Sequence, residues 1–236
     1  MTAALAITKR ELRSNFNSPV AYIVVSTFMF IAGYFFCKEL FLYKQAELRG
    51  FFSVTPWLFA IFVPAATMRL LAEEKGSGTL ELLITMPVRD WDVVVGKFLA
   101  AMGLLVVLIL LTVPYAVTLA FLGPLDKGPA FAGYIGLLLM SGAFAGIGLM
   151  ASSLTRNQIV AFIVALGISL ALCVFGIVIQ VSPEPLQPLL SFLAVSQHLE
   201  SINRGVLDSR DVFYFLSIIA ISLVVAKVSL ESRKWK

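Results

Sequence analysis

The sequence has very few of the residues that most catalytic and metal sites use. Among its 236 residues there is one histidine, His198, and there are two cysteines, Cys37 and Cys173. A metal-ligand cluster or a Cys–His nucleophile pair cannot be assembled from this set. The sequence also lacks the G-x-x-x-x-G-K-S/T pattern of a P-loop. We therefore expect no catalytic residue, bound metal or bound cofactor on this chain. Both cysteines are expected to be small buried apolar residues, and His198 a polar residue of an outer loop.

Charge is also scarce. Charged residues make up 14% of the chain and hydrophobic residues 59%, and the mean hydropathy is +0.94. This balance is typical of an integral membrane protein. A helical span needs about 20 apolar residues, and six runs meet that length. They cover approximately residues 20–37, 54–71, 98–122, 131–154, 159–181 and 212–228. The sequence therefore predicts a single all-α polytopic domain over residues 1–236, with six transmembrane helices.

Lysine and arginine fall unevenly on the two sides of these runs. With a cytoplasmic N-terminus, 12 of the 18 basic residues lie in inner segments and 6 in outer segments. Cytoplasmic segments carry the excess of basic residues, so both termini are expected in the cytoplasm. The net charge of +4 then reflects topology, and we expect no nucleic-acid partner because no basic stripe with interleaved aromatics is present.

A polar interval at residues 72–97 separates the second and third runs. Its Gly-Ser-Gly sequence at 76–78 predicts a break in the arriving helix, because glycine has backbone freedom that a helix must give up. Residues 79–86 then fit two helical turns that end before Pro87. Leu80, Leu83 and Ile84 form the apolar face of these turns. Glu81 lies near the positive end of their helix dipole. This cytoplasmic segment is either a docking surface for another protein or an ordinary interfacial loop helix.

Two other segments outside the spans have a defined character. Residues 2–14 suit an amphipathic helix along the cytoplasmic surface, or a plain positive flank that fixes orientation. Residues 182–211 are too polar and proline-rich to span, which predicts an outer re-entrant or interfacial segment before the sixth span. Asp208 with Asp211 resembles a capping arrangement for that span, and Asp90 is the expected N-cap of the third.

The fourth run contains small residues at helical spacing. Gly142 and Gly146 recur four residues apart, and Ala145 and Gly148 lie beside them. Small residues let helices approach closely in lipid. We expect this face to pack against another helix, with a substrate groove as the alternative.

Two stretches resemble the signatures of a known family. Residues 73–83, EEKGSGTLELL, followed by Pro87 and the Gly96–Lys97 pair, resemble the E-E-x-x-x-G-T-L-E-x-L-x-x-x-P…G-K pattern of ABC-2-type permeases. Such permeases are the membrane subunits of a class of ABC exporters. Residues 198–208, HLESINRGVLD, resemble the segment before the last span in the branch of gliding-motility and nitrous-oxide-reductase-maturation permeases. The resemblance covers the whole chain in length, span count and order.

This resemblance implies a permease subunit in the bacterial inner membrane that is not itself an enzyme. It would pair with a second permease copy or a paralogue, and each would sit on a separate cytoplasmic ABC ATPase that binds ATP and Mg²⁺. A coupling helix would dock in a groove of that ATPase, so that hydrolysis drives substrate movement or mechanical work. The residues implied for coupling are Glu73, Glu74, Gly76, Gly78, Thr79, Leu80, Glu81, Leu83, Ile84 and Pro87. Those implied in the outer segment are His198, Glu200, Arg204, Gly205 and Asp208.

Two other classes of function are open to such a chain. A secondary transporter needs ionisable residues near the membrane midplane, and the six runs offer essentially none there. A membrane scaffold or mechanotransducing subunit, acting on a periplasmic protein, needs the same coupling helix as a transporter. The sequence therefore favours an ATP-driven permease, keeps the mechanotransducer as the alternative, and does not indicate a substrate.

Overall fold

The computed structural model describes residues 3–42, 47–79, 89–123 and 126–232, and every regular element among them is a helix. Six helical segments are long and apolar enough to cross a membrane. They are Pro19–Phe41, Arg49–Ser77, Asp90–Leu122, Lys127–Leu154, Gln158–Val181 and Ser209–Glu231. Each contains one of the six apolar runs, so the predicted all-α polytopic fold is confirmed.

The first, fourth and sixth spans are single helices, and the second and third are each broken once. The helices of the spans are α2 (Pro19–Leu42), α3 (Arg49–Thr67) with α4 (Arg69–Ser77), α6 (Asp90–Leu110) with α7 (Val113–Leu122), α8 (Lys127–Leu154), α9 (Gln158–Val178) and α12 (Ser209–Glu231). The third span breaks just before Pro114, which has no N–H to donate to the preceding turn. The fifth span ends in the short helix η1 (Ile179–Val181). Outside the spans lie α1 (Ala3–Asn17), η2 (Glu184–Leu186), α10 (Gln187–Leu193) and α11 (Val195–Asn203).

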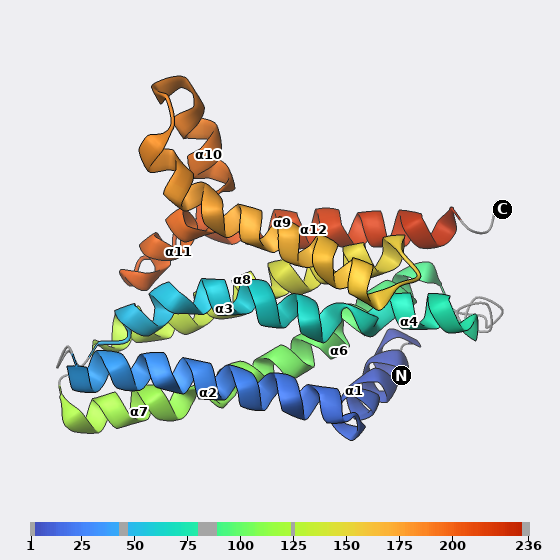
Figure 1. Cartoon of the computed structure of the whole chain (residues 1–236), viewed down its shortest axis with the longest axis horizontal. Helices are drawn as coiled ribbons and strands as arrows, with labels where there is room; N and C mark the ends of the chain where they lie inside the picture. Colours follow the sequence, from blue (N-terminus) through green and yellow to red (C-terminus); the bar gives the residue numbers. More distant parts are fainter. Residues whose placement is uncertain (1–2, 43–46, 80–88, 124–125, 233–236) are drawn as a thin grey trace.

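The spans run side by side along one long axis (Figure 1). Helices α1 and α4, the start of α6 and the end of α12 lie at one end of this bundle, which we call the α4 end. Helices α10 and α11 and the start of α12 lie toward the other, which we call the α11 end (Figure 1). Both ends of the described chain therefore lie at the α4 end, as six spans require.

Helix α8 is the centre of the bundle. Of an 18-residue apolar stretch of α8, 78% is buried inside the chain. The corresponding share is 28% for the first span, 17% for the fifth and 22% for the sixth. The small residues of α8 explain this position, because ideal Cβ atoms at Gly142 and Gly146 lie 3.0 Å and 3.2 Å from side-chain atoms of Ile219 and Ser222 in α12. The predicted close packing of this face is confirmed.

Three local predictions have mixed outcomes. Asp208 is the N-cap of α12, since its side chain accepts a hydrogen bond from the Arg210 N–H at 3.0 Å. The prediction for Asp90 was wrong: it is the first residue of α6, and Arg89 occupies the N-cap position. The prediction for the cysteines is confirmed for Cys173, which is buried, and wrong for Cys37, which is exposed. Cys37 lies on α2, most of whose surface faces away from the rest of the chain.

We predict that Gly148→Ala lowers the free energy of unfolding by about 1–3 kcal/mol, the usual cost of overpacking a core. A Cβ at Gly148 would lie 1.9 Å from the Thr67 hydroxyl oxygen, and that buried hydroxyl is already bonded to the Val63 carbonyl. Thermal unfolding in detergent measures the effect. The control is Gly167→Ala on α9, where a Cβ meets nothing within 4 Å and where the change is expected to be neutral or stabilising. Combining Gly148→Ala with Thr67→Ala should restore part of the loss, because the 1.9 Å contact is removed while the Thr67 Cβ still lies 2.8 Å from the new Cβ. Equal stability of Gly148→Ala and Gly167→Ala would contradict this packing.

Candidate functional site

The α4 end holds the first group of residues implied for coupling. Helix α4 ends at Ser77, and Gly78 follows with a φ of 75°, a conformation that glycine adopts without a Cβ penalty. The predicted helix break is therefore confirmed at Gly78. Gly76 instead lies inside α4, where a Cβ would come within 2.9 Å of the Arg156 carbonyl oxygen. It lets the last turn of α4 pass close to the connection between α8 and α9.

Ser152 of α8 fastens the start of α4. Its hydroxyl oxygen accepts hydrogen bonds from the Leu71 and Ala72 N–H groups at 3.0 Å and 2.9 Å, and its proton is donated to the Met68 carbonyl at 2.9 Å. The first N–H groups of a helix have no partner within that helix. A side chain of another span therefore caps α4 at the joint with α3.

Lys75 fastens the other end of α4. The residue is 6% exposed, and its ammonium donates to the Ser153 carbonyl and, at 3.5 Å, to the Ser229 hydroxyl. Ser229 in turn donates to the same Ser153 carbonyl at 2.6 Å. A lysine at the carboxyl end of a helix is favourable, because the last carbonyls carry partial negative charge. Lys75 thus joins α4 to the last turns of α8 and α12.

An ion cluster around the buried Lys97 joins α4 to α1 and α6. Lys97, whose side chain is 1% exposed, lies with its ammonium 2.8 Å from Glu74 Oε1 and 3.3 Å from Glu11 Oε1. Arg10 lies 2.8 Å from Glu11 Oε1 and 3.5 Å from Glu74 Oε1. Two cations and two anions therefore neutralise one another. Helix α1 reaches this position because Gly96 has no side chain: a Cβ there would lie 2.9 Å from the Ala4 carbonyl oxygen.

The sequence reasoning missed this cluster. It placed Glu73 and Glu74 together on a surface, whereas Glu73 is half exposed and bonded to Arg69 at 3.0 Å, and Glu74 turns inward to Lys97. A signal was present in the sequence, because a lysine that begins an apolar span needs a partner. The positions of its partners depend on the tertiary fold.

The remaining coupling residues fall mostly outside the described part of the chain. Thr79 is exposed, with its hydroxyl 2.9 Å from that of Ser77. Leu80, Glu81, Leu83, Ile84 and Pro87 lie outside the described residues, so the short amphipathic helix stays a prediction.

At the α11 end, His198 is an anchor rather than a free loop residue. Its Nδ1 lies 2.7 Å from Asp211 Oδ1 at the start of α12, and its Nε2 lies 3.1 Å from the Phe192 carbonyl oxygen of α10. The ring stacks on Tyr214 with centroids 3.9 Å apart. A carboxylate and a carbonyl both accept, so the two bonds together require either two ring protons or a proton on Asp211. His198 thereby ties α10 and α11 to α12.

The other outer residues have local roles. Glu200 of α11 and Arg204, the C-cap residue that follows this helix, form an exposed ion pair one turn apart. Gly205 has a φ of 89° and donates its N–H to the Ile202 carbonyl at 2.9 Å, which ends the helix. Asp208 caps α12. The predicted outer segment is thus two short helices in sequence, and the structure does not bring these residues together around one ligand-sized site.

The structure is that of a six-span membrane protein in which hydrogen bonds and ion pairs hold the helices together at the α4 end. The model of the family described as ABC-2 family transporter protein matches residues 5–235. The chain therefore belongs to this family and is a membrane transport subunit of the permease kind. None of the curated protein sequences compared with the chain matches it.

We predict that Lys97→Met lowers the free energy of unfolding by about 3 kcal/mol, because it leaves Glu74 without its nearest cation and Glu11 with Arg10 alone. The control is Lys227→Met, which removes a one-turn surface pair with Glu231 and should cost about 0.5 kcal/mol or less. Thermal unfolding in detergent compares the two. The double variant Lys97→Met with Glu74→Gln should lose less than the sum of the single changes, and simple additivity would mean that the cluster is not energetically coupled.

We also predict that His198→Ala speeds hydrogen exchange in α10 and α11 by at least about tenfold, because it removes the bonds to Asp211 and to the Phe192 carbonyl together with the stacking on Tyr214. Mass spectrometry of peptides covering residues 187–203 measures this exchange. Glu200→Ala on the same helix removes only an exposed pair and should leave the exchange unchanged. Equal exchange in the two variants would show that His198 does not hold the outer helices.

Proposed function

We propose that the chain is the permease subunit of an ATP-driven ABC exporter, and that residues 73–87 couple it to a separate cytoplasmic ABC ATPase. The observation that supports this proposal is the set of hydrogen bonds and ion pairs that hold α4 to neighbouring helices. Its first turn is capped by Ser152 of α8. Its last turn is bonded through Lys75 to α8 and α12. Glu74, between them, pairs with Lys97 of α6.

These bonds suit a segment through which a partner protein moves the spans. The interval between Gly78 and Arg89 leaves α4 and enters α6, and both helix ends are held by charged groups or buried hydroxyls. A displacement applied to that interval is therefore passed to spans two, three, four and six instead of being absorbed by bending at a loose end. An unattached interfacial loop helix has no need of such connections.

A permease of this kind has two partners, an ABC ATPase and a second permease subunit. The ATPase supplies ATP and Mg²⁺ binding, and this chain binds neither. Leu80, Leu83 and Ile84 fill the groove of the ATPase while Glu73 and Glu81 meet basic residues on its rim. A second permease copy or a paralogue completes the unit. The α4 end faces the cytoplasm of a bacterial inner membrane, in agreement with the basic-residue distribution.

A mechanotransducing subunit is the second candidate, and one observation favours it. The outer helices α10 and α11 are bonded to α12 through His198 and Asp211, so movement of α12 reaches the outer surface. Residues 198–208 also carry the resemblance to the gliding-motility and nitrous-oxide-reductase-maturation branch. As a mechanotransducing subunit, the chain would act on a periplasmic protein through its outer segment, and no substrate would cross the membrane.

We predict that Glu81→Lys or Leu83→Asp abolishes most stimulation of the ATPase by the permease while the permease stays folded. Losing one buried anchor of an interface typically costs 2 kcal/mol or more, about 30-fold in affinity. The measurement is ATP hydrolysis in nanodiscs by the chain co-purified with the ATPase encoded beside it.

The matched controls lie at the α11 end. Glu184→Lys and Leu189→Asp make the same chemical changes at exposed positions and should leave ATP hydrolysis as in wild type. If no ATPase co-purifies, or if all four variants behave alike, residues 73–87 are not the coupling segment. Loss of hydrolysis with the Leu189→Asp control would favour the mechanotransducer, because the outer segment would then control the ATPase.

A further inference from the structure

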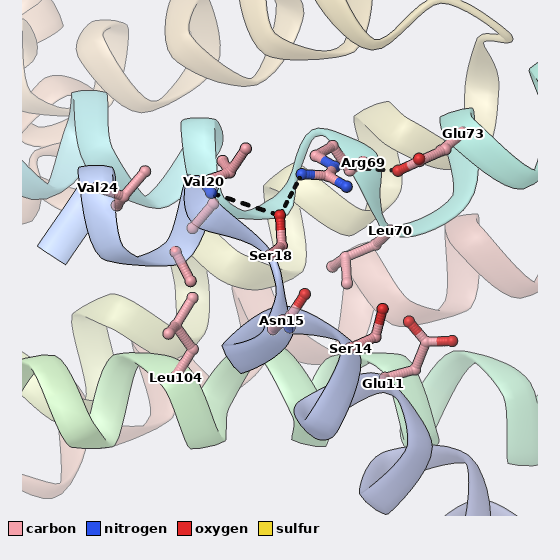
Figure 2. Close-up of a pocket in the computed structure, with 12 residues that line it drawn as sticks. Glu11, Ser14, Asn15, Ser18, Val20, Val24, Arg69, Leu70, Glu73 and Leu104 are labelled. Carbon is pink, nitrogen blue, oxygen red and sulfur yellow. Dashed lines mark hydrogen bonds and ion pairs between the residues drawn. The ribbon is translucent and has the colours of Figure 1, made fainter.

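A cleft opens at the α4 end where α1 turns into α2, beside the joint of α3 and α4 (Figure 2). The cleft is open to its surroundings, and about 530 Å³ of empty space lies within it when the open mouth is included. One side of the cleft carries polar side chains from α1 and α4, including Ser14, Asn15, Arg69 and Glu73. The other side carries Val20, Val24 and Leu104 (Figure 2).

The polar side lies at the level where the apolar spans begin. Ser18 immediately precedes Pro19, the first residue of span one. Arg69 follows α3 at the point where span two turns from apolar to charged. Val20 and Val24 lie further along α2, within the span. Lipid phosphates lie at this boundary and acyl chains lie beyond it, so the cleft has the polarity of a phospholipid along its length.

Arg69 has donors to spare for a phosphate. Its Nε donates to Glu73 Oε2 at 3.0 Å and one terminal nitrogen donates to the Ser18 hydroxyl at 3.2 Å. A guanidinium has five N–H groups, so within the described part of the chain three of them have no hydrogen-bond partner. The side chain is 32% exposed, and its planar fork matches two oxygens of a phosphate.

The acids of the cleft complement a second charge. Glu73 is half exposed, and the ion pairs of Glu11 with described residues use Oε1 alone. Both carboxylates line the same cleft as Arg69. They can therefore accept N–H groups of a ligand whose phosphate binds Arg69. Arg69 pairs with Glu73, and Glu11 belongs to the neutral cluster with Arg10, Glu74 and Lys97. These charges balance, which fits a headgroup that has both a phosphate and a primary ammonium. A headgroup with only a negative charge would meet the acids without compensation.

We propose that this cleft binds one phosphatidylethanolamine molecule of the surrounding bilayer. Arg69 and Ser18 hold its phosphate, Glu73 and Glu11 accept from its ammonium, and one acyl chain lies along Val20, Val24 and Leu104. This site goes beyond the proposed function and does not depend on it, because a lipid here needs neither the ATPase nor a transported substrate.

The test is retention of lipid from nanodiscs that contain equal amounts of phosphatidylethanolamine, phosphatidylcholine and phosphatidylglycerol. Native mass spectrometry of the gently released protein identifies the lipid that stays bound. Wild type should retain phosphatidylethanolamine about tenfold above the other two, since choline has no N–H to donate and glycerol has no cation. Equal retention of the three lipids, or preference for either of the others, overturns the proposal.

Two variants place the lipid in the cleft. Arg69→Gln removes the phosphate donor, and Ala66→Leu adds bulk to the lining without removing any polar contact. Both should reduce retention about tenfold, and Ala66→Leu decides the matter if Arg69→Gln does not fold. The matched controls are Arg156→Gln, an exposed arginine at the same end, and Ala120→Leu, an exposed alanine of α7. Retention in Arg69→Gln and Ala66→Leu equal to that in the controls overturns the site.

A third variant tests the ammonium. Glu73→Gln keeps the size of the side chain and removes its charge, so the preference for phosphatidylethanolamine over phosphatidylcholine should fall. An unchanged preference would overturn the role of Glu73 as the ammonium acceptor. Lipid retention is measured on the permease without the ATPase. Because Glu73 is also a proposed coupling residue, the coupling test uses Glu81 and Leu83 instead, so failure of the lipid site is distinct from failure of the proposed function.

Discussion

The burial of one ammonium group constrains the whole α4 end. Lys97 is 1% exposed, and an unpaired charge there would cost several kcal/mol of desolvation. Its partners must therefore come from neighbouring helices, and they are Glu74 of α4 and Glu11 of α1. Because the second partner is on α1, that helix must lie across α6, which Gly96 permits. The α1 wall of the cleft proposed to bind lipid depends on the same placement.

Such a cluster is a poor source of stability, since well-packed apolar groups of the same volume do as well or better. What it supplies is a fixed register. Glu74 meets Lys97 only when α4 has the correct rotation about its own axis, and the same rotation brings Lys75 to the Ser153 carbonyl. The charged residues of α4 therefore orient the chain as it enters the segment proposed to meet the ATPase.

The sequence was sufficient for elements whose cause is local or set by the bilayer. Six apolar runs became six spans, Gly78 ended α4 and Asp208 capped α12. It was insufficient where a third helix decides. Glu73 and Glu74 look alike in the sequence, but their helix rotation turns one outward and the other toward Lys97. His198 looks like a loop residue, because Asp211 and Phe192 are brought to it only when α10 and α11 fold back on α12. Cys37 looks like any apolar residue, because a span that faces lipid has the composition of one that faces protein.

Helix α12 joins the two ends of the bundle through side-chain bonds near both of its ends. It is unbroken from Ser209 to Glu231, whereas spans two and three are interrupted at Met68 and at residues 111–112. At the α4 end Ser229 shares the Ser153 carbonyl with Lys75, and at the α11 end Asp211 holds His198. An unbroken helix transmits a displacement along its axis, while a broken one bends at its joint. Movement that begins at α4 under the proposed coupling would therefore reach the outer helices through α12. Bending at Met68 and at residues 111–112 would rearrange the spans around the central helix α8.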